Sequence, residues 1–261
     1  MHKILPLLSI ARPLTTVMGG SVLSSYGLED EKSNVTNCLK EINPELVIER
    51  EISVMSMTFA QAIRHLDTVE NTDILVFLFG TSVGWPRISR KLEEYLRPEL
   101  MTPTAMHIPV YKSSSKQRRL RSKVRHFYRN ILKILLFPLG LYRPRQSIEG
   151  LPEILDSICD MAESRAKLII WVQHNSLGYR RLFLERRVYD AYFNSILKHL
   201  QNKVSPHFRL LAPDKSFLIQ DNFLLDGVHL SPLGHKRMAQ HINSEINSAL
   251  LFAKSFIRGT N

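Results

Sequence analysis

Cysteine, metal-binding patterns and long apolar runs are scarce in this sequence of 261 residues. Its two cysteines, Cys38 and Cys159, fit no metal-binding or redox spacing, so we expect buried thiols in a reducing compartment. The ten histidines form no HExxH or comparable cluster, so we expect neither a metal ion nor another cofactor. We expect His235 and His241 to lie on a helix surface. No run approaches the roughly 20 apolar residues that span a bilayer.

The amino terminus resembles a secretory signal peptide only superficially. Met1-His2-Lys3 precedes a short apolar run, and cleavage after that run would leave little room before the first expected strand. We therefore interpret this segment as part of the mature protein and predict a cytoplasmic location. A chain of 261 residues with 44% hydrophobic residues suits a single core, so we assign residues 1–261 to one domain.

Acidic residues are absent between Met101 and Ile148. The basic residues in this interval number eleven, which equals the formal net charge of +11, so the rest of the chain is balanced. We interpret residues 101–148 as a basic helical insertion within the domain. The basic residues are Lys112, Lys116, Arg118, Arg119, Arg121, Lys123, Arg125, Arg129, Lys133, Arg143 and Arg145.

This insertion has four interpretations. A basic stretch, residues 116–129, leads to an apolar one, residues 131–142. Such a pair of helices can lie on an anionic membrane surface, where each nearby Lys or Arg contributes about 1 kcal/mol, so residues 112–145 are a candidate contact with the inner membrane face. The insertion could equally be a lid over an active site, or a solvated face whose apolar end packs on the core. Nucleic acid is the least favoured partner, because no binding module is recognisable.

Apolar runs alternate with helical patterns in the rest of the chain. The most continuous run, residues 73–79, is typical of a central parallel strand that is covered on both faces. Alternating strands and helices predict a three-layer α/β fold. We expect strands at residues 14–18, 46–48, 73–79, 166–173 and 208–211, and helices at residues 35–42, 59–69, 152–164 and 188–200 and after Pro232.

Near the carboxyl end, Asp226 and His229 are three residues apart on a loop that leads into a helix. Ser231 suits the N-cap of that helix and Pro232 suits its first turn. A carboxylate beside an imidazole can hold one ring tautomer while the other nitrogen faces outward, which is part of a Ser-His-Asp arrangement. The alternative is an ordinary helix-entry loop.

The serine that could complete this arrangement is Ser21. It follows an expected buried strand and the pair Gly19-Gly20, so we expect it at the carboxyl end of the sheet, where open α/β folds bind ligands. The alternative is a tight turn without a catalytic role. The early serine combined with the late Asp-x-x-His pair favours a hydrolase-type scaffold.

Other candidates follow two strands that end at the same edge. Beyond the strand at residues 73–79, Trp85 could stack on a sugar and Arg87 could bind an anion, or both could belong to an ordinary surface loop. His174 follows the strand at residues 166–173. It is a candidate either for substrate contact or for a hydrogen bond to loop backbone.

Four blocks of the sequence resemble the SGNH (GDSL-like) hydrolase superfamily in order and spacing. Residues 226–235 resemble its closing pattern D-G-x-H-L-x-x-x-G-H, and Gly19-Gly20-Ser21 resembles G-D-S with Gly20 in place of the aspartate. Ser56 stands where the second block usually has glycine, and Ser82 stands where the third block has asparagine. The resemblance covers most of the chain outside the insertion.

The resemblance implies a flavodoxin-like α/β/α fold with a central parallel sheet of about five strands. It also implies a serine esterase or acyltransferase, with Ser21 as nucleophile, His229 as base and Asp226 orienting the imidazole. The oxyanion donors would be the backbone N–H groups of Ser21 and Ser56 and the side chain of Ser82, with Arg87 as a compensating donor.

The expected substrate is an acylated small molecule or carbohydrate, or a lipid-linked glycan of polysaccharide metabolism. Trp85, the basic insertion and the expected cytoplasmic location favour such a substrate. The alternative is a non-catalytic scaffold of the same fold that docks on a membrane or a glycan-assembly complex through the insertion. The serine at position 82 favours that alternative, because its side chain is shorter than the family's asparagine.

Overall fold

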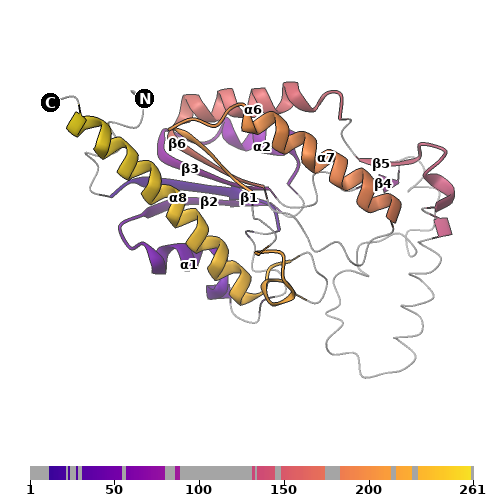
Figure 1. The fold of residues 1–261 in the computed structure, drawn as a ribbon, viewed down its shortest axis with the longest axis horizontal. Coiled ribbons are helices and arrows are strands. Elements are labelled where there is room, and N and C mark those ends of the chain that lie inside the picture. Colours follow the sequence, from indigo (N-terminus) through magenta and orange to yellow (C-terminus); the bar gives the residue numbers. More distant parts are fainter. Residues whose placement is uncertain are drawn as a thin grey trace. The chain divides into compact units, whose positions relative to one another are not determined.

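A parallel sheet of five strands forms the centre of the computed structural model (Figure 1). The structure describes residues 12–21, 23, 28, 31–54, 57–79, 86–88, 131–132, 134–144, 148–173, 183–212, 216–224 and 229–259. The strands are β1 (Leu14–Gly19), β2 (Val47–Ser53), β3 (Thr72–Phe79), β6 (Ala166–Gln173) and β7 (Phe208–Leu211). Their order is β2-β1-β3-β6-β7, and each neighbouring pair is parallel. The predicted parallel α/β sheet is confirmed.

Helices cover both faces of this sheet, which gives the fold three layers (Figure 1). They are α1 (Val35–Ile42), α2 (Phe59–Leu66), α6 (Leu151–Arg165), α7 (Phe183–Gln201) and α8 (Pro232–Gly259). Every residue of β3 is buried, and its side chains alternate between two hydrophobic cores. Val76 packs in the core that α1 and α8 cover, whereas Phe77 packs in the core of α2, α6 and α7. Period-two alternation therefore supplies apolar groups to both layers.

Local side-chain caps fix where the helices begin. Thr58 and Gln61 form a capping box at α2: the Gln61 N–H donates to Thr58 Oγ1 (3.2 Å), and the Thr58 N–H donates to Gln61 Oε1 (2.9 Å). At α1 the Asn34 side chain accepts a hydrogen bond from the Asn37 N–H (2.8 Å). At α8, Ser231 Oγ accepts from the Gly234 N–H (3.1 Å). The predicted cap at Ser231 is confirmed.

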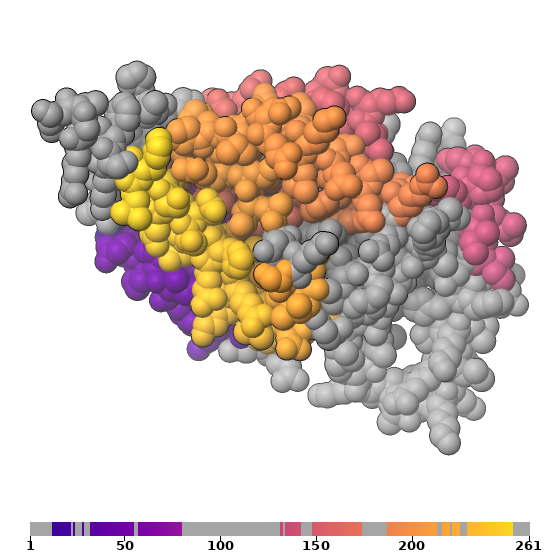
Figure 2. All heavy atoms as spheres, viewed as in Figure 1, coloured from indigo at the N-terminus to yellow at the C-terminus, as the bar shows by residue number. Residues whose placement is uncertain are grey.

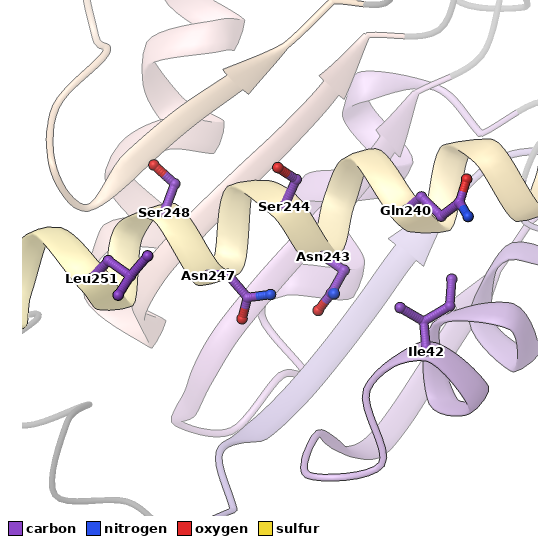
Figure 3. A pocket seen from close by; sticks show the side chains of 7 residues that line it. All are labelled: Ile42, Gln240, Asn243, Ser244, Asn247, Ser248 and Leu251. Carbon is purple, nitrogen blue, oxygen red and sulfur yellow. The ribbon is translucent and has the colours of Figure 1, made fainter.

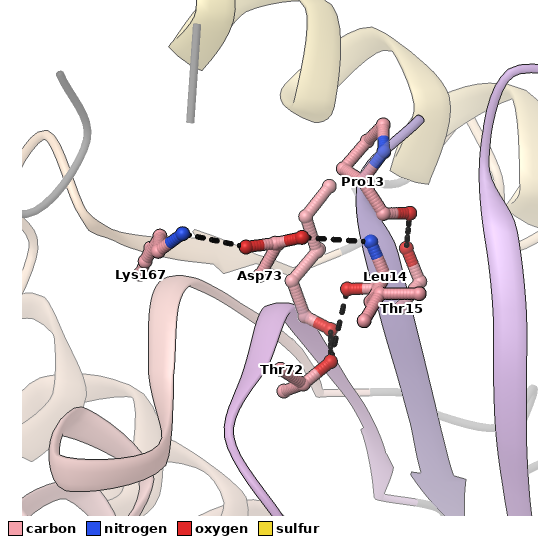
Figure 4. A network of polar contacts seen from close by, with 7 residues as sticks. Pro13, Leu14, Thr15, Thr72, Asp73 and Lys167 are labelled. Carbon is pink, nitrogen blue, oxygen red and sulfur yellow. Dashed lines mark hydrogen bonds and ion pairs between the residues drawn. The ribbon is translucent and has the colours of Figure 1, made fainter. Parts of the chain in front are cut away.

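A polar network ties together the amino ends of three adjacent strands (Figure 4). Asp73 lies at its centre: one carboxylate oxygen accepts from the Leu14 N–H (2.9 Å), and the other pairs with Lys167 Nζ (2.8 Å). Thr72 Oγ1 donates to the Leu14 carbonyl (2.9 Å). Because these residues begin β1, β3 and β6, the network fixes the strand ends opposite the edge where Ser21 lies.

The chain divides into two compact units. One comprises residues 1–83, 146–180 and 190–261, and the other comprises residues 84–145 and 181–189. The first unit contains the sheet. The second contains the antiparallel pair β4 (Pro86–Ile88) and β5 (Tyr142–Pro144). The limits of the insertion, residues 101–148, stay a prediction, and residues 89–130 lie outside the described part. No helix among the described residues is both long and apolar enough to cross a bilayer.

Both cysteines are buried free thiols, as the sequence predicts. Cys38 lies in α1 and Cys159 in α6, each facing one of the two cores. Burial raises the pKa of the Cys38 thiol, and burial raises the pKa of the Cys159 thiol to about 12. The thiolate is the reactive form of cysteine, so burial and a raised pKa both lower the reactivity of these two thiols in the native protein.

We therefore expect native protein at pH 8 to react negligibly with 5,5′-dithiobis(2-nitrobenzoate) over minutes, because neither thiol is ionised or accessible. Unfolding in guanidinium chloride should release both thiols to the reagent. The absorbance of the released thionitrobenzoate measures the reaction, and a Cys38→Ser variant assigns it. Rapid native labelling of Cys159 would contradict its position in the core.

Candidate functional site

The sheet topology itself points to a ligand site at the carboxyl ends of β1 and β3. From β1 the chain passes through α1 to β2 on one side, and then through α2 to β3 on the other side of β1. The connection that leaves β1 leads to α1 and β2 on one side, whereas the chain that leaves β3 leads on to α6 and β6 on the other side. Because α1 and α6 cover opposite faces, these two connections diverge between β1 and β3. Open α/β sheets bind ligands at such a switch point, outside the carboxyl ends of the strands.

Ser21 lies at this switch point, two residues beyond the end of β1, and is half-buried. The preceding backbone is held from both sides: the Gly20 N–H donates to the Leu78 carbonyl of β3 (3.1 Å), and the Gly19 carbonyl accepts from the Val54 N–H (3.0 Å). A hydrogen bond from the Leu23 N–H to the Gly20 carbonyl (3.0 Å) closes the turn. Ser21 is therefore the first central residue of a fixed turn.

The two glycines before Ser21 have different steric roles. A Cβ on Gly19 would lie 2.6 Å from the Leu78 carbonyl oxygen, so close packing of β1 on β3 requires glycine there. A Cβ on Gly20 would meet its nearest atom, the Met57 backbone nitrogen, at 3.7 Å, which is ordinary contact. Position 20 therefore accepts a Cβ, which agrees with the aspartate that the G-D-S pattern places there.

His229 is half-buried just before α8, on the connection that leaves the carboxyl end of β7. Its carbonyl accepts a hydrogen bond from the Leu224 N–H (2.8 Å), and Leu230 beside it forms an antiparallel bridge with Phe223. Both Phe223 and Leu230 are buried in the core under α8. From here α8 runs back along the sheet, and its other end lies near the start of β1 (Figure 1). His229 thus lies at the carboxyl side of the sheet, as Ser21 does.

Asn222 organises the loop that carries His229. It ends the short helix η4 (Gln220–Asn222) and is fully buried. Its side-chain amide donates to the Phe217 carbonyl (2.7 Å), and its side-chain oxygen accepts from Arg237 Nη1 (2.8 Å). Its backbone carbonyl accepts from the Ser231 N–H (3.0 Å). One buried residue thereby joins the loop before His229 to the helix after it.

The start of α8 is packed directly on η4. Ser231 Oγ donates to the Asp221 carbonyl, which adds a second link between the cap and η4. A Cβ on Gly234 would lie 2.0 Å from the Asn222 carbonyl oxygen, so glycine alone permits this approach. The glycine near the end of the D-G-x-H-L-x-x-x-G-H pattern thus has a steric reason in this structure.

The prediction that His235 lies on a helix surface was wrong. His235 is 1% exposed, whereas Leu233 is 42% exposed. The inward face of α8 contains His235, Met238 and Ile242, which recur at i, i+3 and i+7. The helical spacing alone could have revealed this, since Leu233 does not fit it. His241 is exposed, as expected, and its ring meets Phe217 edge-on at 5.8 Å.

Several predicted site residues fall outside the described part of the chain. These are Asp226, Ser56, Ser82, Trp85 and His174. Arg87 lies in β4, where the backbone alone is described. The structure therefore describes Ser21 and His229 of the predicted set. Sequence reasoning missed Asn222 and Arg237, because no motif distinguishes them from other polar residues near a helix start.

The open cavity between α1 and α8 does not belong to this site (Figure 3). It has a volume of about 470 Å³ and follows α8 towards its carboxyl end. Most of α8 lies at the surface of this face of the molecule (Figure 2). The lining offers amide and hydroxyl groups without an ionisable side chain, so it provides no nucleophile with a base. The lining residues are Ile42, Gln240, Asn243, Ser244, Asn247, Ser248 and Leu251.

Comparison with known proteins identifies the fold. No family model matches the sequence, and no curated protein matches it significantly. The psychrotrophic esterase EstA from a Pseudoalteromonas species superposes with a TM-score of 0.53 and 10% identity, over 91% of this chain and 98% of its own. A structure described as a putative lipolytic protein of the G-D-S-L family from Desulfitobacterium hafniense superposes with a TM-score of 0.50 and 11% identity, over 90% of this chain and 99% of its own. A mutant of the acetyl-xylooligosaccharide esterase Axe2 from Geobacillus superposes with a TM-score of 0.51 and 14% identity, over 91% of this chain and 95% of its own.

These identities are low, so the likeness concerns the fold. The superposition includes nearly the whole of each neighbour, and the strand order here is the flavodoxin-like one. The chain therefore has the α/β/α fold of the SGNH hydrolases, as the sequence motifs predicted. Among the described residues, no group of three or more His, Cys, Asp or Glu side chains could hold a metal ion.

Proposed function

We propose that this protein is a serine esterase or acyltransferase of the SGNH type. The observation that carries the proposal is the position of Ser21: it stands in a hydrogen-bonded turn at the switch point between β1 and β3, directly after a strand end that requires glycine. The esterases among the structural neighbours support the same class of reaction. A nucleophile held on a rigid turn at a ligand-binding edge is the arrangement that acyl transfer requires.

In the proposed mechanism, His229 accepts the proton of Ser21 as Oγ attacks the ester carbonyl. Asp226 orients the imidazole and stabilises its protonated form. The tetrahedral intermediate collapses to an acyl-enzyme as His229 returns the proton to the departing alcohol. Water or a second alcohol then attacks the acyl-enzyme, His229 again accepting its proton, and this regenerates Ser21.

The oxyanion of each tetrahedral intermediate needs preorganised donors. We assign this role to the backbone N–H groups of Ser21 and Ser56 and to the side chain of Ser82, with Arg87 compensating for the shorter serine. A single side-chain donor of this kind contributes roughly 3–4 kcal/mol to transition-state stabilisation. A backbone donor persists with any side chain, so serine at position 56 preserves that contribution.

The substrate we favour is an acylated carbohydrate or a lipid-linked glycan of polysaccharide metabolism, used at the cytoplasmic face of a membrane. Trp85 can stack on a sugar ring, and His174 follows the end of β6 at the same edge. One structural neighbour is an acetyl-xylooligosaccharide esterase, which supports a carbohydrate ester.

Intact-mass measurement after exposure to a fluorophosphonate probe tests the nucleophile. Attack by Ser21 Oγ on phosphorus forms an O–P bond and expels fluoride, so we expect one adduct on the wild type and none on Ser21→Ala. Ser53→Ala is a matched control, because Ser53 is an exposed serine at the carboxyl end of the neighbouring strand β2. An adduct that persists in Ser21→Ala would contradict the assignment.

A non-catalytic scaffold that docks on a membrane or a glycan-assembly complex is the second candidate. The replacement of the oxyanion asparagine by Ser82 favours it. This alternative predicts a folded wild type that forms no adduct even at high probe concentration.

A further inference from the structure

A short helical stretch in the second unit has an apolar face in addition to the one that it buries. Residues 131–132 and 134–136 are helical, and the chain then turns at Gly140, whose φ is +65°. The Gly140 N–H donates to the Phe137 carbonyl (3.0 Å) and the Leu141 N–H to the Leu136 carbonyl (3.1 Å). These two bonds form a Schellman motif, which gives the stretch a fixed end.

The two faces of this stretch differ in burial. Leu136 points inward and is 8% exposed. Four large apolar residues at i, i+3, i+4 and i+8 form one stripe on the outer side, which we name the apolar stripe. The exposed fraction increases along it: Ile131 39%, Ile134 49%, Leu135 59% and Leu139 67%. Because Leu136 already occupies the buried side, the apolar stripe is a second surface that the described structure leaves exposed to solvent.

The sequence around the apolar stripe is strongly basic. The stripe lies within residues 101–148, the interval that has eleven basic residues and no acidic ones. In the same unit the register of β4 and β5 pairs Arg87 directly with Arg143. Like charges in directly opposite positions destabilise a strand pair, and a bound anion removes that repulsion. The interval therefore combines exposed apolar side chains with a sequence that has basic residues and no acidic ones.

We propose that this surface docks on an anionic phospholipid bilayer, with the apolar stripe inserted at the boundary between headgroups and acyl chains and the basic residues against the phosphates. A helix that lies in a bilayer interface needs this pairing of a bulky aliphatic face with Lys and Arg. A nucleic acid would engage the cations without using Leu135 or Leu139. Binding to lipid does not require Ser21 chemistry and can be tested without it. Docking deepens the proposed function, on which it rests for its role, because it brings the enzyme to a substrate at a membrane face.

Co-sedimentation of the full-length protein with vesicles tests this docking. Vesicles of phosphatidylglycerol and phosphatidylcholine should bind the wild type, and pure phosphatidylcholine vesicles should bind it at least tenfold more weakly. Raising the salt concentration from 0.1 M to 0.5 M should weaken binding to the anionic vesicles, because salt screens the exposed charges. Equal binding to both kinds of vesicle would overturn the charge component of the proposal.

Three variants separate the contributions. Leu135→Gln with Leu139→Gln should weaken binding by tenfold or more, and Arg118→Glu with Arg119→Glu and Arg121→Glu should weaken it on the order of 100-fold. Leu251→Gln with Phe252→Gln is the matched control: these apolar residues on α8 are 65% and 43% exposed and lie outside the basic interval, so their loss should not matter.

Two controls separate docking from catalysis, and two outcomes would overturn docking. Ser21→Ala should sediment with vesicles as the wild type does. In the absence of vesicles, the Leu135/Leu139 variant should keep wild-type fluorophosphonate labelling. These two results distinguish a failure of docking from a failure of catalysis. Binding to a 20-nucleotide RNA but not to anionic vesicles would overturn docking on lipid. Stripe-dependent dimerisation in analytical ultracentrifugation without vesicle binding would also overturn it, in favour of a second copy as the occupant.

Discussion

Replacing His229 with alanine is expected to lower ester turnover by about 10⁴- to 10⁶-fold. The variant retains Ser21 but removes the base that activates it, and a serine hydroxyl without a base is a poor nucleophile at neutral pH. The measurement is hydrolysis of p-nitrophenyl acetate at pH 8, corrected for the uncatalysed reaction. Fluorophosphonate labelling of Ser21 should slow in parallel, because it depends on the same activation.

The His229→Ala protein should remain folded. The His229 carbonyl accepts a hydrogen bond from the Leu224 N–H (2.8 Å), and alanine preserves this bond between backbone groups. His241→Ala is a matched control, since His241 is an exposed histidine on α8. Its turnover should stay within about twofold of wild type, as expected for an exposed residue remote from the reacting groups. An active His229→Ala enzyme would contradict the assigned base.

The fold was predictable wherever one local pattern determined the outcome. The run at residues 74–79 is apolar throughout, and the structure buries every residue of β3. Thr58 with Gln61, and Ser231 with Pro232, are short-range start signals, and each cap forms as its sequence predicts. Such features need no knowledge of distant contacts.

Strand β2 shows where local patterns failed. We expected a strand at residues 46–48, whereas β2 extends over Val47–Ser53. Its middle residues, Glu49, Arg50 and Glu51, are exposed because β2 is an edge strand that pairs with β1 alone. Backbone hydrogen bonds to β1 keep this charged stretch extended although it shows no hydrophobic alternation. The length of β2 therefore depends on the neighbouring strand.

The candidate site was predictable to a similar extent. Motif residues such as Ser21 and Gly234 are recognisable in sequence, and the structure supplies a steric reason for Gly234. Asn222 and Arg237 belong to no motif, and their hydrogen bond joins residues on different elements. Their role follows from tertiary geometry, which a single sequence does not display.

Gly234→Ala is expected to be the most destabilising single-methyl addition described here. The new Cβ would lie 2.0 Å from the carbonyl oxygen of Asn222, and its next contacts are also backbone atoms of Asn222. Backbone cannot rotate away as a flexible side chain can, so α8 must separate from η4. We expect the free energy of unfolding to fall by about 3 kcal/mol or more, and the Tm to fall by roughly 6–12 °C in differential scanning calorimetry.

Gly20→Ala is the control that distinguishes a steric effect from the general effect of replacing glycine. Its Cβ would meet nothing nearer than 3.7 Å, so stability should change by less than about 1 kcal/mol, and the lower entropy of the unfolded chain favours a small gain.

The same separation of α8 from η4 that destabilises Gly234→Ala would move the backbone that ends at His229, because the Ser231 N–H bonds to the Asn222 carbonyl. Gly234→Ala should therefore also label more slowly with fluorophosphonate at a temperature where it is fully folded. An unchanged Tm would mean that the start of α8 can move from η4 at no cost, and the close packing of these two elements would then not be what holds His229 in place.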